Sequence, residues 1–309
     1  MISQQILKNE YTLTKHIFSG ITNKKYHENK QKELTSMIIN RQSDKMKIIA
    51  IMFPIDKDLS IIESFIIRIG GSITFKISFD LLLKLTTLTK SDTHYIINIP
   101  NGLIFKNDSE FLIYELEYYE IDFELLLNNK DYNICFQVIT EHKKYLIKKY
   151  EITKEIKDIS LTIKNDDKYI EIFNIEYIPK NISITNDYEI VNFKDTKLIK
   201  VDMSSASIGI FIKTDIMDKV SIHVNEQLLL ERDKKNIEKI EKDLYWISFE
   251  PSKKWNDSVS NIYVKTCDKF RWNDIIVSFN NNKSGTIYLM NCYKLIYFRG
   301  FASRQPIFG

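Results

Sequence analysis

The sequence predicts an all-β protein of two β-sandwiches, with short helices inserted between strands. Its 309 residues exceed the usual size of one domain, so two domains are expected. Only eight Gly and five Pro punctuate the chain. Between them lie many short runs rich in Ile, Val, Phe, Tyr and Thr, in which apolar and polar residues alternate. A hydrophobic fraction of 44% is typical of a folded chain and argues against disorder.

Two-residue alternation marks the individual strands. Each such run has one apolar and one polar face, as a strand at the surface of a sandwich requires. Thr286–Phe298 is instead apolar on both faces, which predicts a central strand covered on both sides. The alternating or strand-like runs are Met46–Phe53, Ile73–Ile77, Tyr119–Leu125, Tyr169–Tyr177, Val220–Val224, Asn261–Lys265 and Ile275–Phe279.

Gly70-Gly71 predicts a hairpin turn between two of these runs. A two-residue loop would place apolar residues opposite polar ones, whereas a three-residue loop pairs Ile69 with Ile73 and Ile67 with Phe75. The three-residue register is therefore expected, with a glycine supplying the positive φ. A phosphate-binding glycine loop would need a lysine and a helix after it, and neither follows.

Two short helices are expected as insertions between strands. Ser78 can cap a helix that carries Phe79, Leu82 and Leu83 inward. The charged segment Glu231–Asp243 can form a surface helix.

No motif points to catalysis, a metal or a cofactor. The five histidines lack the three- or four-residue spacing of ligands on one helix face, and Cys135, Cys267 and Cys292 show no CxxC pattern. Nucleophile elbows and phosphate loops are missing as well. The sequence predicts a protein that is not an enzyme, has no cofactor and keeps its cysteines reduced and buried.

Three clusters leave an alternative open. The acidic cluster around Glu120 could supply paired carboxylates for glycoside hydrolysis, although its alternation favours a solvated strand face. The basic run Lys143–Lys149, with interleaved tyrosines, could stack on bases, although flanking glutamates favour an exposed strand or loop. The three tryptophans could form a sugar platform, although a core is favoured. The acidic cluster is Glu115, Glu117, Glu120, Asp122 and Glu124; the tryptophans are Trp246, Trp255 and Trp272.

Charge and hydropathy limit the partners. A formal net charge of +3 is too balanced for a nucleic-acid-binding surface, so no specific nucleic acid is expected. The N-terminal residues have neither the basic nor the apolar region of a signal peptide, and no run stays apolar for about 18 residues. A soluble chain without a secretion signal is expected.

Several segments resemble the double jelly-roll major capsid proteins of nucleocytoplasmic large DNA viruses. In Lys45–Leu85, a strand ends at Pro54, a second enters Gly70-Gly71, and a returning strand leads into a short helix, as in that family. Ile97–Leu127 is similar to a family segment with a Tyr-His-Glu-like core, here Tyr118-Tyr119-Glu120 without the histidine.

The C-terminal part carries the rest of the resemblance. Ile287–Gly300 is similar to the closing strand of the family through Tyr293, Leu295 and Gly300, and Ile247–Pro251 is similar to the strand and proline before it, ending at Pro251. The resemblance implies two consecutive eight-stranded jelly rolls, with residues 1–182 forming an N-terminal arm and the first jelly roll and residues 187–309 forming the second.

The resemblance also implies a function. Family members form homotrimers with a pseudo-hexagonal outline that tile an icosahedral shell, so the expected place is the virion capsid, assembled in the host cytoplasm. Expected partners are neighbouring capsomers and minor capsid proteins, and the polar arm Met1–Gln42 is expected to contact neighbours or an inner membrane. The alternatives are a minor capsid or scaffold protein of the same lineage, a carbohydrate-binding attachment module, and a glycosidase-like enzyme.

Overall fold

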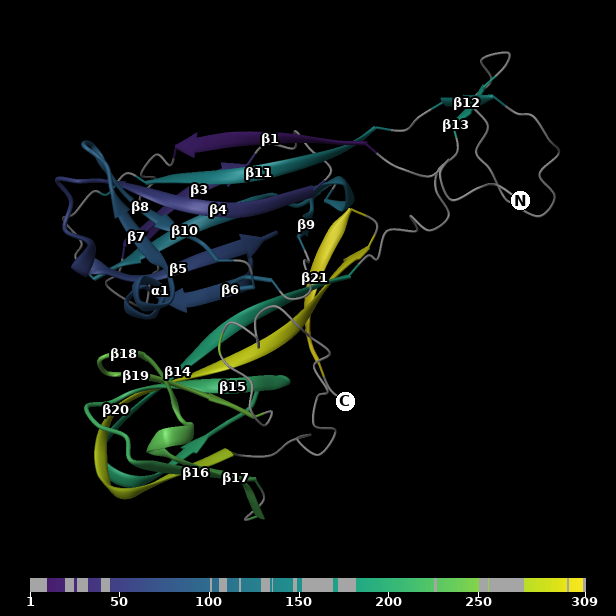
Figure 1. Ribbon diagram of the computed structural model, residues 1–309. Helices are drawn as coiled ribbons and strands as arrows, with labels where there is room; N and C mark the ends of the chain where they lie inside the picture. The colour runs from purple at the N-terminus through teal and green to yellow at the C-terminus, as the bar shows by residue number, and fades with distance from the viewer. Residues whose placement is uncertain are drawn as a thin grey trace, which may run out of the picture.

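The computed structural model shows two bodies rich in β-strands, one above the other in Figure 1. Of the described residues, most lie in strands, and one short α-helix, α1 (Phe79–Leu85), is present together with brief 3-10 turns. The predicted all-β class is confirmed. None of the helices in the described ranges is long and apolar enough to cross a membrane. The structure describes residues 10–19, 25–26, 33–39, 45–100, 102–105, 110–116, 118–128, 134, 136–146, 149–151, 169–171, 182–224, 227–249, 255, 275–298 and 300–307.

The first body is a sandwich of two antiparallel sheets. The first sheet has the spatial order β1 (Glu10–Ser19), β11 (Gln137–Leu146), β4 (Lys45–Pro54), β8 (His94–Asn98) and β7 (Thr87–Lys90), with β9 (Phe111–Leu112) also paired to β4. The second has the order β2 (Lys25–Tyr26), β3 (Glu33–Ile39), β10 (Ile121–Leu127), β5 (Ile62–Ile69) and β6 (Ser72–Ser78). Neighbours in space are often distant in sequence, as crossovers of a jelly roll require.

Aromatic side chains fill the space between these sheets. Phe53 of β4 stacks on Phe136 at 6.3 Å between ring centroids, and Phe65 of β5 packs at 6.2 Å from Phe123 of β10. All four rings are fully buried. The apolar face of each alternating strand therefore turns inward. A separate pair, β12 (Lys149–Glu151) and β13 (Tyr169–Glu171), lies outside both sheets.

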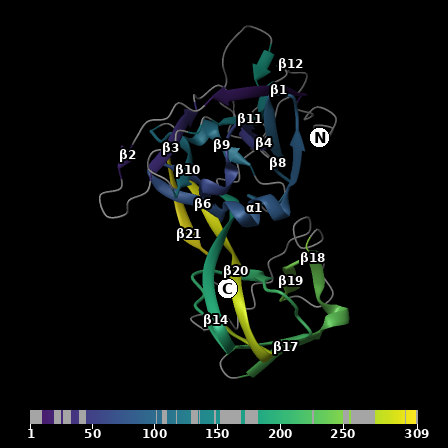
Figure 2. The same ribbon diagram turned by 90° about the vertical axis from the view of Figure 1, so that its left-hand side faces the viewer.

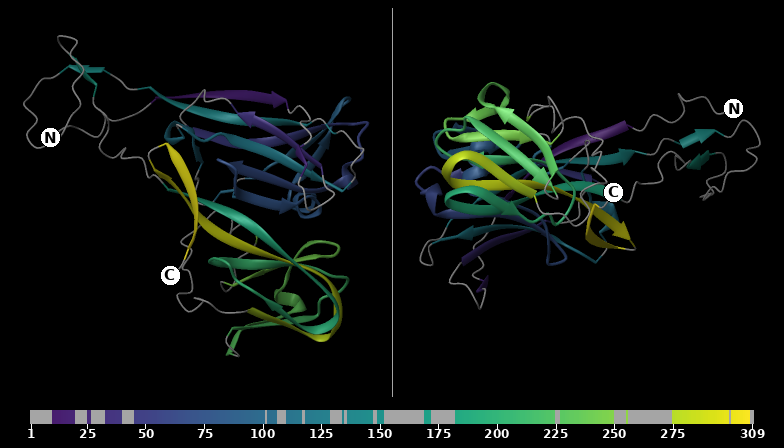
Figure 3. Two further views of the ribbon diagram at one scale, coloured as in Figure 1. Left: turned by 180° about the vertical axis from the view of Figure 1, so that it is seen from behind. Right: turned by 90° about the horizontal axis from the view of Figure 1, so that it is seen from below.

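The second body is built from one sheet that bends into two layers. Its order is β17 (Gln227–Asp233), β16 (Lys219–Val224), β20 (Ile275–Phe298), β15 (Ser207–Lys213), β19 (Leu244–Ser248) and β18 (Glu238–Glu241), while β14 (Ile182–Val201) and β21 (Phe301–Pro306) also pair with β20. The long strands β14 and β20 curve through the whole body (Figures 1 and 3). The N-terminal part of β20 pairs with β16 and its middle part with β15, so β20 belongs to both layers.

The corner between the two layers has a local cause. Asp195 of β14 adopts a positive φ of 46°, and its N–H donates to Ser284 Oγ at 2.9 Å. The pairing of β14 with β20 shifts twice beside it. Strands that pass from one layer to another commonly bend at such irregularities. Val220, Val277 and Leu289 from the two layers then share one buried core.

Several predicted strands are confirmed. Met46–Phe53 lies in β4 and Val220–Val224 in β16. Ile275–Phe279 and Thr286–Phe298 both lie in β20, where residues 287–293 are all buried, as a central strand requires. The strand predicted to begin at Tyr119 begins at Ile121, and only residues 169–171 of Tyr169–Tyr177 are described as strand. Asn261–Lys265 lies outside the described residues.

The predicted three-residue register at Gly70-Gly71 is wrong at the turn. Ile69 pairs with Ser72, so the loop has two residues, with φ of 56° at Gly70 and 81° at Gly71. Two positive φ values give the type I′ geometry that matches strand twist. A bulge at Thr74 then restores the expected partnership of Ile67 with Phe75, and Thr74 Oγ1 donates to the Ile67 carbonyl at 3.0 Å. The bulge keeps the apolar faces together despite the shorter loop.

The helix predictions are partly wrong. Ser78 caps α1 as expected, because its Oγ accepts the Leu81 N–H at 3.3 Å. Leu81 is fully buried in α1, whereas Leu83 is only half-buried. The segment Glu231–Asp243 is not a helix: it comprises the end of β17, a 3-10 turn at Lys234–Asn236, and β18. An isolated helix of this length has only marginal stability in water. The pairing of β17 with β16 and of β18 with β19 therefore determines the conformation of this segment.

The described parts of the predicted N-terminal arm belong to the fold. Within Met1–Gln42, β1 pairs with β11 and β3 pairs with β10, so these segments extend the two sheets. Backbone pairing satisfies more hydrogen-bonding groups than a free arm could. The division at residues 182–187 stays a prediction; the structure has β14 beginning at Ile182.

Gly285 provides a test of the bent sheet. A Cβ at this position would lie 2.0 Å from the Lys213 carbonyl oxygen on β15. Because backbone cannot move aside cheaply, we expect Gly285→Ala to lower the free energy of unfolding by about 2 to 4 kcal/mol, measured by urea denaturation. Asn281→Ala, at an exposed position of the same strand, is the control. An unchanged stability for Gly285→Ala would contradict the close packing of β15 on β20.

Candidate functional site

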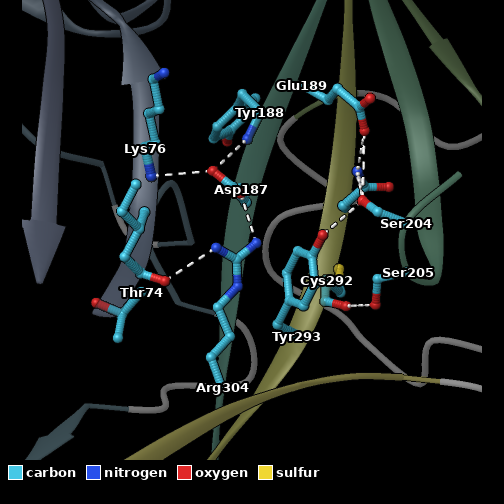
Figure 4. A network of polar contacts seen from close by, with 12 residues as sticks. Thr74, Lys76, Asp187, Tyr188, Glu189, Ser204, Ser205, Cys292, Tyr293 and Arg304 are labelled. Carbon is cyan, nitrogen blue, oxygen red and sulfur yellow. Dashed lines mark hydrogen bonds and ion pairs between the residues drawn. The ribbon is translucent and has the colours of Figure 1, made fainter. Parts of the chain in front are cut away.

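The two bodies meet where β6, an edge strand of the first, faces β14 and β21 of the second (Figure 4). The Lys76 N–H donates to Asp187 Oδ1 at 3.1 Å. Arg304 Nη1 donates to the Ile73 carbonyl at 3.1 Å. Edge strands expose backbone groups that can pair with another chain. Here two side chains of the second body satisfy such groups.

Asp187 and Arg304 also bind each other. Arg304 Nη2 lies 2.6 Å from Asp187 Oδ2, and both side chains are about four-fifths buried. The Tyr188 N–H adds a bond to Asp187 Oδ1 at 3.0 Å, and the Arg304 guanidinium lies 3.5 Å from the centroid of the Tyr293 ring. Charge-assisted hydrogen bonds and ring stacking of this kind fix geometry as well as energy. We call Asp187, Arg304 and their two backbone contacts on β6 the edge clip.

A polar network supports the edge clip from behind. The Tyr293 hydroxyl lies 2.6 Å from Ser204 Oγ, and Asn291 Nδ2 donates to Ser204 Oγ at 3.2 Å and to Glu189 Oε2 at 3.3 Å (Figure 4). Burial raises the pKa of the Glu189 carboxyl and of the Tyr293 phenol, although their bonds to Ser204 oppose the shift. Asn291 Oδ1 is buried without a partner among the described residues.

Backbone contacts extend the junction along β14. Asn186 Nδ2 donates to the carbonyls of Gly102 and Leu103 at 2.7 and 3.1 Å, and the Asn186 N–H donates to the Ile104 carbonyl at 2.8 Å. The Tyr188 hydroxyl donates to the Leu103 carbonyl at 3.2 Å. A loop of the first body is therefore held by a strand of the second.

The apolar core of the first body extends across the junction to residues of the second body, whose interior holds a separate apolar core. Tyr188 lies 6.1 Å from Phe75 of the first body and 6.4 Å from Phe211 of the second, measured between ring centroids. Phe211 in turn contacts Trp246 at 4.5 Å and Trp255 at 4.9 Å. Interfaces between mobile domains are usually smaller and more polar. The apolar core that crosses the junction favours one rigid unit.

Helix α1 makes a further polar contact across the junction. Asp80 accepts from Lys213 Nζ at 2.8 Å, and Lys84 pairs with Asp243. Both pairs are partly exposed and add little energy individually. They add contacts beyond the edge clip, because α1 follows β6 in the chain (Figure 2) whereas the edge clip contacts Ile73 and Lys76 of β6 itself.

Most of the family-like residues named from the sequence meet at one end of this junction. The Gly70 N–H donates to the Glu120 carbonyl at 3.1 Å, and the Tyr119 ring lies where a Cβ on Gly70 would be, at 2.4 Å. The Tyr118 N–H donates to the Gly300 carbonyl at 2.9 Å. Three turns that are distant in sequence therefore converge. Gly71 has open space around its Cα, and Gly300 has a φ of 83°.

The remaining named residues have separate places. Tyr293 lies beneath Arg304, and Leu295 is fully buried in the core on β20. Pro251 lies outside the described residues. Asp187 and Arg304 were missed from the sequence because a single acid and a single base, 117 residues apart, form no local pattern.

The candidate chemical clusters do not assemble into a reactive site within the described residues. Glu124, expected on a solvated face, is buried and pairs with Arg68 at 2.7 Å. On β5, Arg68 lies opposite Asp122 of β10, so its long side chain reaches Glu124 diagonally. Trp246 and Trp255 are buried as core residues. No group of three or more potential metal ligands occurs in the part of the chain that the structure describes. Cys292 is buried, as expected, and its thiol forms no disulfide within the described residues. Some of the residues named from the sequence lie outside the described residues: Glu117, Cys135, Cys267, Trp272 and the side chains of the basic run.

Comparison with solved structures identifies proteins with a similar overall fold. A quasi-atomic model of the PBCV-1 virus capsid superimposes with a TM-score of 0.60 at 10% identity, covering 96% of this chain and 97% of that one. PBCV-1 VP54, fitted into a reconstruction of the virophage Sputnik, gives 0.57 at 8% identity over 96% and 97%. The major capsid protein P2 from bacteriophage PM2 gives 0.51 at 8% identity over 93% and 100%.

These likenesses span both bodies and show that the chain has the double jelly-roll fold of viral capsid proteins, as the sequence resemblance predicted. No protein-family model matches the sequence, and no curated protein matches it.

The edge clip can be tested with a double-mutant cycle. Arg304→Met should leave Asp187 partly buried without its charge partner and lower the free energy of unfolding by about 2 kcal/mol in urea denaturation. Asp187→Asn combined with Arg304→Met should cost less than the sum of the single changes. Strict additivity would show that the two side chains do not act together.

The buried carboxyl of Glu189 should make the stability of the protein depend on pH. Because burial raises its pKa in the folded state, the folded protein binds this proton more tightly than the unfolded chain does. The contribution of Glu189 is therefore most favourable below its ordinary pKa of 4.5 and declines as the pH rises through its folded-state pKa. We expect Glu189→Gln to flatten the stability profile above pH 4.5, measured by thermal unfolding. A profile parallel to that of the unmodified protein would contradict this assignment.

Proposed function

We propose that the chain is a structural capsid subunit of a DNA virus that forms trimeric capsomers of an icosahedral shell. The observation that carries this proposal is the double jelly-roll fold, shared over more than nine-tenths of the chain with capsid structures. The low identity limits the comparison itself to the fold, so the role is inferred from the geometry.

The geometry suits a hexagonal building block. A chain with two similar sandwiches contributes two lobes, and three chains around a three-fold axis give six lobes of nearly equal shape. Such an outline tiles a surface with one kind of subunit. Regular tiling requires that the two lobes of each chain keep a fixed angle, because a hinge between them would make the hexagonal outline irregular. The edge clip and the aromatic contacts across the junction support that rigidity.

The proposal has consequences for partners and place. The subunit would be found in the virion capsid after assembly in the host cytoplasm, in contact with neighbouring capsomers and minor capsid proteins. The same proposal includes contact of the N-terminal segment Met1–Gln42 with an inner membrane. Within that segment, β1 and β3 are strands of the two sheets, so the contact would be made by residues beside them. No catalytic role, cofactor or specific nucleic acid is needed.

The competing functions receive less support from the described residues. A carbohydrate platform would need exposed tryptophans, but Trp246 is 2% and Trp255 is 6% exposed. A glycosidase would need two carboxyls facing a cleft, but Glu124 is engaged with Arg68. A minor capsid or scaffold protein of the same lineage shares the fold and differs in whether its trimers tile.

The oligomeric state tests the proposal. The purified chain should sediment as a trimer of about 110 kDa, three times the 36.6 kDa of one chain. Electron microscopy at higher protein concentration should show hexagonal arrays or shells. Trimers that never tile would favour the minor capsid or scaffold role. A chain that remains monomeric at all concentrations would contradict the capsid proposal.

A further inference from the structure

Three aromatic side chains form an exposed surface at the end of the junction where the turns converge. Tyr118 is 61% exposed, Phe298 is 62% exposed and Phe301 is 44% exposed. Phe298 and Phe301 are cross-strand partners on β20 and β21, and the Tyr118 ring packs on Phe301 at 5.0 Å between centroids. We call these three residues the aromatic ledge.

The aromatic ledge is held in place from beneath. Phe301 also contacts the half-buried Tyr119 ring edge-on at 5.1 Å, and Tyr119 in turn covers Gly70. The Tyr118 N–H is bound to the Gly300 carbonyl. Residues from both sandwiches therefore fix the rings before any partner arrives. A preformed apolar surface loses little conformational entropy when a partner covers it.

The size of the aromatic ledge is that of a binding surface. With about 200 Å² for a full aromatic side chain, the three rings expose roughly 300 Å². This is comparable to the largest apolar patch of a typical monomer, which is often functional. A standard protein interface buries about 800 Å² on each partner. The aromatic ledge can supply the apolar centre of such an interface, and Ile182, 45% exposed and paired with Ile296 on the same sheet, lies beside it.

The surroundings of the aromatic ledge distinguish between classes of partner. Glu120 follows Tyr119 in sequence, and Lys294 shares a strand face with Phe298; both are exposed. Ser303 and Gln305 of β21 are exposed as well. An apolar centre with a polar rim of both charges is typical of protein interfaces. A membrane or nucleic-acid surface would instead favour a basic rim.

We infer that the aromatic ledge binds a second copy of this chain. The inference rests on the proposed function, because a shell built from one subunit places further copies against its lateral surfaces. Opposite charges at Glu120 and Lys294 let the rim of one copy complement that of another. The three rings would then become the buried centre of a contact between subunits.

Self-association of a surface variant tests this inference. Phe298→Ser should weaken association of the full chain by about tenfold in sedimentation velocity over a concentration series, because an anchoring aromatic ring at an interface contributes more than 1 kcal/mol. The matched control is Leu228→Ser, on edge strand β17 and 57% exposed, which should associate as the unmodified chain does. Thermal unfolding of each variant checks that it remains folded.

Photo-cross-linking provides a second measurement that does not depend on whether the serine variant folds. p-Benzoylphenylalanine placed at position 298 should give covalent dimers, and the same residue at position 228 should not. If the unmodified chain assembles but Phe298→Ser associates equally well and position 298 gives no dimers, the inference is overturned while the capsid proposal stands. A chain that never self-associates would overturn both.

Discussion

The arrangement of the whole molecule depends on how the open edge of β6 is closed. A sandwich with an uncovered edge strand exposes backbone groups to any other strand. In this chain the edge is closed by side chains rather than by another strand: Asp187 accepts from Lys76, and Arg304 donates to the Ile73 carbonyl. The two side chains neutralise each other in a largely buried position. Because one comes from β14 and the other from β21, closing the edge also fixes the second sandwich against the first.

This constraint fits the proposed structural role. Polar residues from distant parts of the sequence support this junction: Ser204, Asn291 and Glu189 lie around the Tyr293 ring on which Arg304 lies. Aromatic contacts also cross the junction, from Phe75 of the first sandwich through Tyr188 to Phe211 of the second. The proposed shell subunit needs two lobes at a constant angle, and both features favour such an angle.

Sequence patterns predicted the strands well and the connections poorly. Alternation located β4, β16 and β20 because each has an apolar face that only burial can satisfy. The Gly70-Gly71 register failed because a bulge at Thr74 can restore side-chain matching after a shorter loop, and no pattern reports a bulge. Glu231–Asp243 failed because its charges allow a helix, while pairing with neighbouring strands determines the outcome. The edge clip could not be foreseen, since one carboxylate and one guanidinium become partners only after two sandwiches have formed.

Cryo-electron microscopy of the assembled protein tests directly whether the junction at β6 holds the two sandwiches in one orientation within a trimeric capsomer. We expect a particle with three-fold symmetry and six lobes. In it, the two lobes of each chain should be joined at β6 by Asp187 and Arg304 and keep one angle in all particles. A particle without three-fold symmetry, or one in which the two sandwiches of a chain adopt several relative orientations, would contradict it.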